Sequence, residues 1–197
     1  MRDNRSKSRP TIGVFSYGFA GNFLWAGAIE AARQYDVNLI GFAGGSLHSP
    51  RGFEAQANIL FDLVDPFLFD GLLLDSGVLS HYVGTNALHE FCGRYPNIPI
   101  VSSEVALKGI PSVLLDFYQG IRELIGHLIE THNCRHIAFI RGPQESQTAE
   151  ERYHAYLKAL SEYGIPFDPE LVAPGTFFAP SGAEAITLLL DERQVSF

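Results

Sequence analysis

TIGVFSYGFAGNFLWAGAIEAARQYDVNLIGFAG, residues 11–44, is the stretch that decides the fold class. An apolar run over 11–17 is followed by a helical pattern over 22–35 and a second apolar run over 37–44. Both runs are apolar at nearly every position, which is typical of parallel strands that are buried on both faces. The stretch therefore predicts a strand–helix–strand unit of an α/β fold.

The same alternation continues to the end of the chain. Further strands are predicted over 69–76, 98–104, 112–117, 136–142 and 171–177, and further helices over 52–64, 85–95, 119–131, 148–163 and 181–190. This pattern predicts two lobes, each a doubly wound parallel sheet. We expect a tail over 1–10, an N-terminal lobe over 11–132 and a partial C-terminal lobe over 133–197. The second lobe is expected to be incomplete, because two strands are few for a sheet.

Two helix ends can be predicted from their capping residues. Gly164 follows the helical pattern over 148–163 and is expected at the C′ position, where glycine commonly ends a helix. Ser181 with Glu184 three residues later matches a capping box, which predicts Ser181 as the N-cap of the last helix.

Composition and charge restrict the possible functions. The chain has 197 residues, 46% of them hydrophobic, and a net charge of −8, which argues against a nucleic-acid surface. Its basic cluster lies in the tail 1–10. No apolar run approaches the about 18 residues of a membrane span, and the polar start does not resemble a signal peptide. We therefore expect a cytoplasmic protein without a membrane partner.

Cysteine and histidine spacing indicates neither disulfides nor metal. Cys92 and Cys134 have no CxxC spacing, so no disulfide framework is expected. His132 and His136 have a metal-ligand spacing but no further ligand nearby, so we expect no metal site. No phosphate loop and no nucleophile elbow occurs, and we expect no cofactor and no catalytic residue.

Several segments carry a family likeness in collinear order. HIAFIRGPQESQTAEERYHAYLKALSEYGIPFDPELVAPGTFFAPSGAEAITLLL, residues 136–190, resembles the start of the C-terminal lobe of LacI/GalR-type sensor domains. PSVLLDFYQGIRELIGHLIE, residues 111–130, and FDGLLLDS, residues 69–76, resemble earlier segments of the same domains. The resemblance covers nearly all residues from Pro10 onward, and the chain looks truncated relative to the family. It implies a periplasmic-binding-protein-like type I fold, a small-molecule effector and a homodimer.

The resemblance leaves three functions open. Residues 27–64 are most similar to sensor domains that are fused to histidine kinases or diguanylate cyclases, which predicts a sensor that signals by lobe closure to an output domain. The alternative is the ligand-binding part of a LacI-type transcription regulator without its helix-turn-helix. Because only residues 1–10 precede the first strand, we expect no direct DNA binding by this chain. The third possibility is an enzyme of flavodoxin-like fold.

In open α/β sheets, ligands bind beyond the carboxyl ends of the strands. The residues at these positions, with Thr148 and Arg152 from the second lobe, form the predicted ligand site: Tyr17, Phe19, Asn22, Asp75, Ser76, Asp116, Phe117, Thr148 and Arg152. The family resemblance assigns ligand contacts to the first loop, Asp116, Thr148 and Arg152. Phe117 departs from the family, which usually has Asn at this position. A carboxylate opposite a guanidinium suits a sugar or nucleoside-like ligand.

Each candidate also has a structural alternative. Asp116 could cap the helix that follows it, and Arg152 could be a surface charge next to Glu151. Tyr17 and Phe19 could pack in the core or in their loop.

Overall fold

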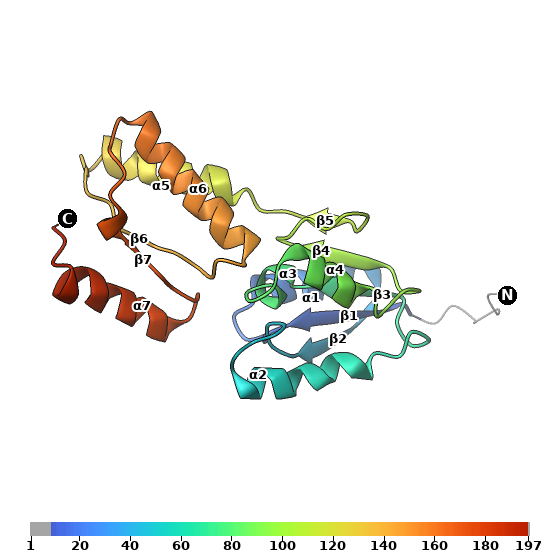
Figure 1. Cartoon of the computed structure of the whole chain (residues 1–197). Coiled ribbons are helices and arrows are strands. Elements are labelled where there is room, and N and C mark those ends of the chain that lie inside the picture. Colours follow the sequence, from blue (N-terminus) through green and yellow to red (C-terminus); the bar gives the residue numbers. More distant parts are fainter. Residues whose placement is uncertain (1–8, 197) are drawn as a thin grey trace. The chain divides into compact units, whose positions relative to one another are not determined.

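The computed structural model describes residues 9–196, so most of the predicted tail lies outside the described residues. The chain divides into two compact units, Met1–Leu114 and Leu115–Phe197, which are described separately below. Figure 1 shows both units with their helices and strands labelled. Among the described residues, no helix combines the length and the apolar character that crossing a bilayer requires.

Unit 1 contains a five-stranded parallel sheet in the order β2-β1-β3-β4-β5. The strands are β1 (Thr11–Ser16), β2 (Asn38–Ala43), β3 (Gly71–Leu74), β4 (Ile100–Ser103) and β5 (Ser112–Val113). The helices are α1 (Phe23–Tyr35), α2 (Gly52–Ala57), α3 (Ser76–Leu79) and α4 (Thr85–Cys92). The predicted helix over 52–64 is α-helical only to Ala57 and continues as a 3-10 helix, Asn58–Leu63.

Aromatic side chains form the core of unit 1. Phe15 on β1 is fully buried and stacks on Phe61 of the 3-10 helix, with 4.7 Å between ring centres. Its ring also contacts Phe42 on β2 at 5.3 Å and Tyr95 after α4 at 5.5 Å, both edge-on. Because such ring pairs add to the free energy gained by burial, this cluster fixes β1 firmly within the sheet.

Unit 2 is built around two long helices and a short parallel strand pair. Its elements are α5 (Phe117–Glu130), β6 (Phe139–Ile140), α6 (Gln147–Glu162), β7 (Val172–Ala173) and α7 (Ala179–Thr187). β6 and β7 are shorter than the predicted strands over 136–142 and 171–177. Pro143 and Pro174, which cannot donate to a strand ladder, lie close behind them. Parallel α/β architecture, the predicted class, is confirmed.

The boundary between the units lies between Leu114 and Leu115, whereas the sequence pattern predicted it after residue 132. α5 belongs to unit 2, because its residues Ile125 and Ile129 pack in one buried cluster with Tyr156 and Leu160 of α6. The Tyr156 hydroxyl also donates to the carbonyl of Ile137 at 2.9 Å. Figure 1 shows α5 and α6 side by side. The break in the chain therefore precedes α5 instead of following it.

The two capping predictions have opposite outcomes. Gly164 has φ +64°, and the amides of Gly164 and Ile165 donate back to Ser161 and Leu160, so the predicted C′ glycine is confirmed. The predicted N-cap Ser181 is wrong, because α7 begins two residues earlier, at Ala179. Pro180 suits the first turn of a helix, and the Ser181 hydroxyl instead donates to the carbonyl of Phe178 at 2.9 Å.

Candidate ligand-binding site

The strand order of unit 1 creates a topological switch point. β2 lies on one side of β1 and β3 on the other, so the connections that leave β1 and β3 run in different directions. In open parallel sheets the ligand crevice lies beyond the carboxyl ends of the strands at such a point. The predicted residues Tyr17, Phe19, Asn22, Asp75 and Ser76 follow β1 and β3.

Asp75 and Asn22 are bonded to each other within unit 1. Asp75 is only 4% exposed, and its Oδ2 accepts from Ser16 Oγ at 2.6 Å and from Asn22 Nδ2 at 3.0 Å. Asn22 is the N-cap of α1, since its Oδ1 accepts from the backbone N–H of Trp25 at 3.0 Å. The structure therefore brings these two predicted residues together and engages both in internal hydrogen bonds.

Ser76 lies in the interior of unit 1. It is fully buried at the start of α3, and its Oγ lies 2.7 Å from Ser102 Oγ on β4. The backbone carbonyl of Ser76 accepts from Ser80 Oγ at 2.7 Å. These bonds join α3 to β4 and close the end of α3, which is a structural role for Ser76.

The two aromatic residues after β1 have different environments. Tyr17 is 42% exposed. Phe19 packs on Trp25, with 4.4 Å between ring centres, and lies against Gly41 of β2. A Cβ at Gly41 would come within 2.5 Å of the Phe19 ring, so this glycine makes room for the ring. Phe19 thus packs against α1 and β2, whereas Tyr17 lies at the surface.

In unit 2, Arg152 of α6 lies beside two aromatic rings. Its guanidinium carbon is 4.0 Å from the centre of the Phe117 ring and 5.4 Å from the centre of the Phe177 ring. Phe117 is the first residue of α5. The rings limit the orientations of the guanidinium, so its hydrogen-bond donors are preorganised.

Asp116 and Thr148 flank this cluster in the sequence and have clear local roles. Asp116 is exposed, and its Oδ1 accepts from the backbone N–H of Gln119 at 2.8 Å, so it caps α5 as the structural alternative proposed. Thr148 is 3% exposed in the first turn of α6, with its Oγ1 3.1 Å from the Oγ of the N-cap Ser146.

Phe177 is absent from the predicted site residues. It has φ +62°, in the left-handed region, which is rare for a bulky residue and recurs at functional sites. Its ring covers Gly142, where a Cβ would come within 2.2 Å of a ring atom. The available signal in the sequence is the aromatic pair Phe177–Phe178 soon after a strand.

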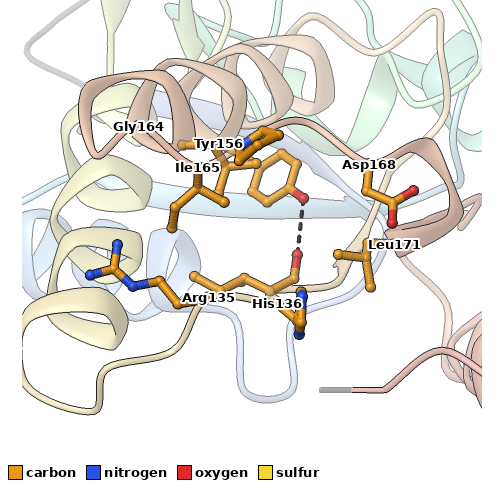
Figure 2. A pocket seen from close by; sticks show the side chains of 10 residues that line it. Arg135, His136, Tyr156, Gly164, Ile165, Asp168 and Leu171 are labelled. Carbon is orange, nitrogen blue, oxygen red and sulfur yellow. Dashed lines mark hydrogen bonds between the residues drawn. The ribbon is translucent and has the colours of Figure 1, made fainter.

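A separate hollow of about 310 Å³ in unit 2 lies away from these residues. Arg135, His136 and Ile137 on its wall precede β6, and Asp168 and Leu171 precede β7, so the hollow lies at the amino ends of the strands. Figure 2 shows the bond from the Tyr156 hydroxyl across it, and Arg135 extending away from Asp168. Burial raises the pKa of Tyr156 to about 12. The charged groups here do not converge on one point, and the hollow is not the predicted site.

The described residues contain no group of three or more His, Cys, Asp or Glu side chains placed to hold a metal ion.

Comparisons with known proteins agree on one family. Residues 22–193 match the family model described as periplasmic binding proteins and sugar binding domain of LacI family. Catabolite control protein A of Priestia megaterium is 26% identical over 195 residues, covering 96% of this chain and 55% of that protein. The regulator AscG of Escherichia coli K12 is 35% identical over 100 residues, covering 51% of this chain and 29% of AscG. The chain thus spans about half or less of the length of these relatives.

Solved structures support the fold. The transcription regulator CcpA of Lactococcus lactis superposes with a TM-score of 0.69 at 23% identity, over 94% of this chain and 65% of that chain. A LacI-family regulator from Mycobacterium smegmatis superposes with a TM-score of 0.70 at 24% identity, over 91% of this chain and 62% of that chain. The relatives are transcription regulators, so the comparisons favour the LacI-type alternative over the predicted sensor with a kinase or cyclase output.

Proposed function

Since the chain belongs to the family of periplasmic binding proteins and LacI-type sugar-binding domains, we propose that it is the effector-binding part of a LacI-type transcription regulator. In this proposal it binds a small polar molecule and performs no catalysis. DNA contact falls to another part of the regulator, which agrees with the net charge of −8 on this chain. A regulator of transcription in bacteria would act in the cytoplasm.

The observation that carries the proposal is the cluster of Arg152, Phe117 and Phe177 in unit 2. A guanidinium held by rings can donate two parallel hydrogen bonds to neighbouring oxygens of a sugar or to a carboxylate. Exposed ring area next to it can cover the apolar face of a sugar or a base. This combination supports a sugar or nucleoside-like effector. One solved relative, the transcriptional regulator CelR, forms a complex with cellobiose, so a sugar is a ligand of that protein.

The mode of action is also a proposal. An effector that binds one conformation of the protein more tightly than another would shift the population toward that conformation. Such a change can pass to a second copy of the chain, and we propose a homodimer as the acting form. Sedimentation at micromolar concentration tests the dimer directly.

The function is tested by thermal denaturation with single compounds from a panel of sugars, nucleosides and amino acids. A compound present at 100 times its dissociation constant should stabilise the protein by about 2.7 kcal/mol. Arg152→Ala should then weaken binding by about 10- to 100-fold, because a charged hydrogen-bond donor is lost.

Arg141→Ala is the matched control. Arg141 also lies over a ring in unit 2, at 3.9 Å from the centre of Tyr153, and it pairs with Glu150. The proposal expects this variant to bind as the wild type does. A panel without any stabilising compound, or equal binding losses in both arginine variants, would count against it.

A further inference from the structure

Three polar side chains meet across the switch point of unit 1. Ser16 ends β1, Asn22 precedes α1, and Asp75 follows β3. Asp75 Oδ2 accepts from Ser16 Oγ at 2.6 Å and from Asn22 Nδ2 at 3.0 Å, and Asn22 Nδ2 also lies 3.0 Å from Ser16 Oγ. Ser16 is 1% exposed and Asp75 4% exposed, so water competes little for these bonds.

The bonds fix both ends of one loop. Residues 17–21 connect Ser16 to Asn22, and Asn22 Nδ2 also lies 3.3 Å from the carbonyl of Gly18 within that loop. The side-chain oxygen of Asn22, Oδ1, accepts from the backbone N–H of Trp25. Two donors converge on one carboxylate oxygen, and charge-assisted bonds of this kind are stronger than neutral ones.

We propose that Asp75 is a positioning residue that holds the loop 17–21 to the end of β3 through Ser16 and Asn22. The inference rests on the proposed function only in that this loop is a predicted part of the effector site. It assigns Asp75 and Asn22 a different role from the ligand contacts predicted for them, because their polar atoms are engaged with each other.

A natural reporter of the loop lies beside it, in the first turn of α1. Trp25 is the single tryptophan of the chain, its amide is bonded to Asn22, and its ring packs on Phe19 of the loop. Trp25 fluorescence and its quenching by acrylamide therefore follow the order of the loop without any added effector.

The decisive variant is Asn22→Asp. Asp caps helices as well as Asn does, so the cap of α1 is kept, but the donor to Asp75 is lost and two carboxylates face each other. Hydrogen exchange at the amide of residue 22, which donates to the carbonyl of Phe19 in the loop at 3.3 Å, should speed up by about tenfold after correction for its intrinsic rate, because a charged hydrogen bond is replaced by repulsion. Quenching of Trp25 should increase as well.

The reciprocal double variant Asn22→Asp with Asp75→Asn supplies the rescue. It restores one amide and one carboxylate with their positions exchanged, and exchange rates and Trp25 quenching should return to within about twofold of wild type. Ser16→Ala removes one donor without changing charge and should increase loop exchange more moderately. It also keeps the inference testable if Asn22→Asp fails to fold.

Two results would overturn the inference: an Asn22→Asp protein with wild-type exchange and quenching, or a double variant no better than the single one. If Asn22→Asp does not fold, wild-type loop exchange in Ser16→Ala would overturn it. These measurements need no effector. A panel that finds no bound compound would therefore count against the proposed function and not against this role of Asp75.

Discussion

The guanidinium of Arg152 on α6 lies 4.0 Å from the centre of the Phe117 ring at the start of α5. The contact joins the two helices whose apolar faces form the core of unit 2. It therefore links the candidate effector site to the stability of that unit.

Replacing the ring of Phe117 should lower the stability of the protein. Phe117→Leu should lower the free energy of unfolding by about 1 kcal/mol through the lost cation–π contact, while Phe117→Tyr should retain it. Urea denaturation of Phe117→Leu, Arg152→Ala and the double variant measures the coupling between the two residues. Additive losses would show that the contact contributes no energy.

Two glycines of unit 2 should respond to alanine with opposite signs. Gly164→Ala places a side chain at φ +64° and should destabilise the protein by about 1 kcal/mol. Gly120→Ala, inside α5 with open space around it, should stabilise it by about 0.5–1 kcal/mol. Thermal denaturation of both variants checks the prediction, and a shift in the same direction for both would contradict it.

The free energy of unfolding should fall at alkaline pH because the phenol of Tyr156 is buried. Burial raises the pKa of Tyr156 from about 10 to about 12, so folding favours the neutral phenol. The stabilising effect is fully present below pH 10 and is lost as the pH rises toward 12. Urea denaturation across this range should show a smaller decline in Tyr156→Phe, although that variant loses the hydroxyl bond to Ile137 and starts about 1 kcal/mol lower.

The two thiols should react at different rates. Burial raises the pKa of Cys92 to about 11, so little thiolate is present at pH 8. Cys134 is half-buried. A thiol reagent in the folded protein should modify Cys134 first, and Cys134→Ser should abolish the fast phase. A fast phase that persists in Cys134→Ser would contradict this order.

Features that depend on local pattern were predictable from sequence. The strand–helix alternation predicted the parallel sheet of unit 1, and Gly164 predicted the end of α6. These depend on periodicity and on backbone conformation, which neighbouring residues determine.

Features that depend on long-range packing could not be predicted from the sequence. The boundary between the units follows from the packing of α5 on α6, and the burial of Ser76 follows from its contact with Ser102 on the neighbouring strand. Strand-end position alone could not distinguish Ser76 from the surface residue Tyr17. Phe177 reaches Arg152 through an unusual backbone conformation that the sequence pattern did not indicate.

The aromatic cluster around Phe15 has a consequence for the neighbouring residue Ser16. Side chains alternate along a strand, so the packing that fixes Phe15 on one face also determines where Ser16 points on the other. A core substitution at Phe61 or Tyr95 would therefore act as a distant modulator of the loop 17–21.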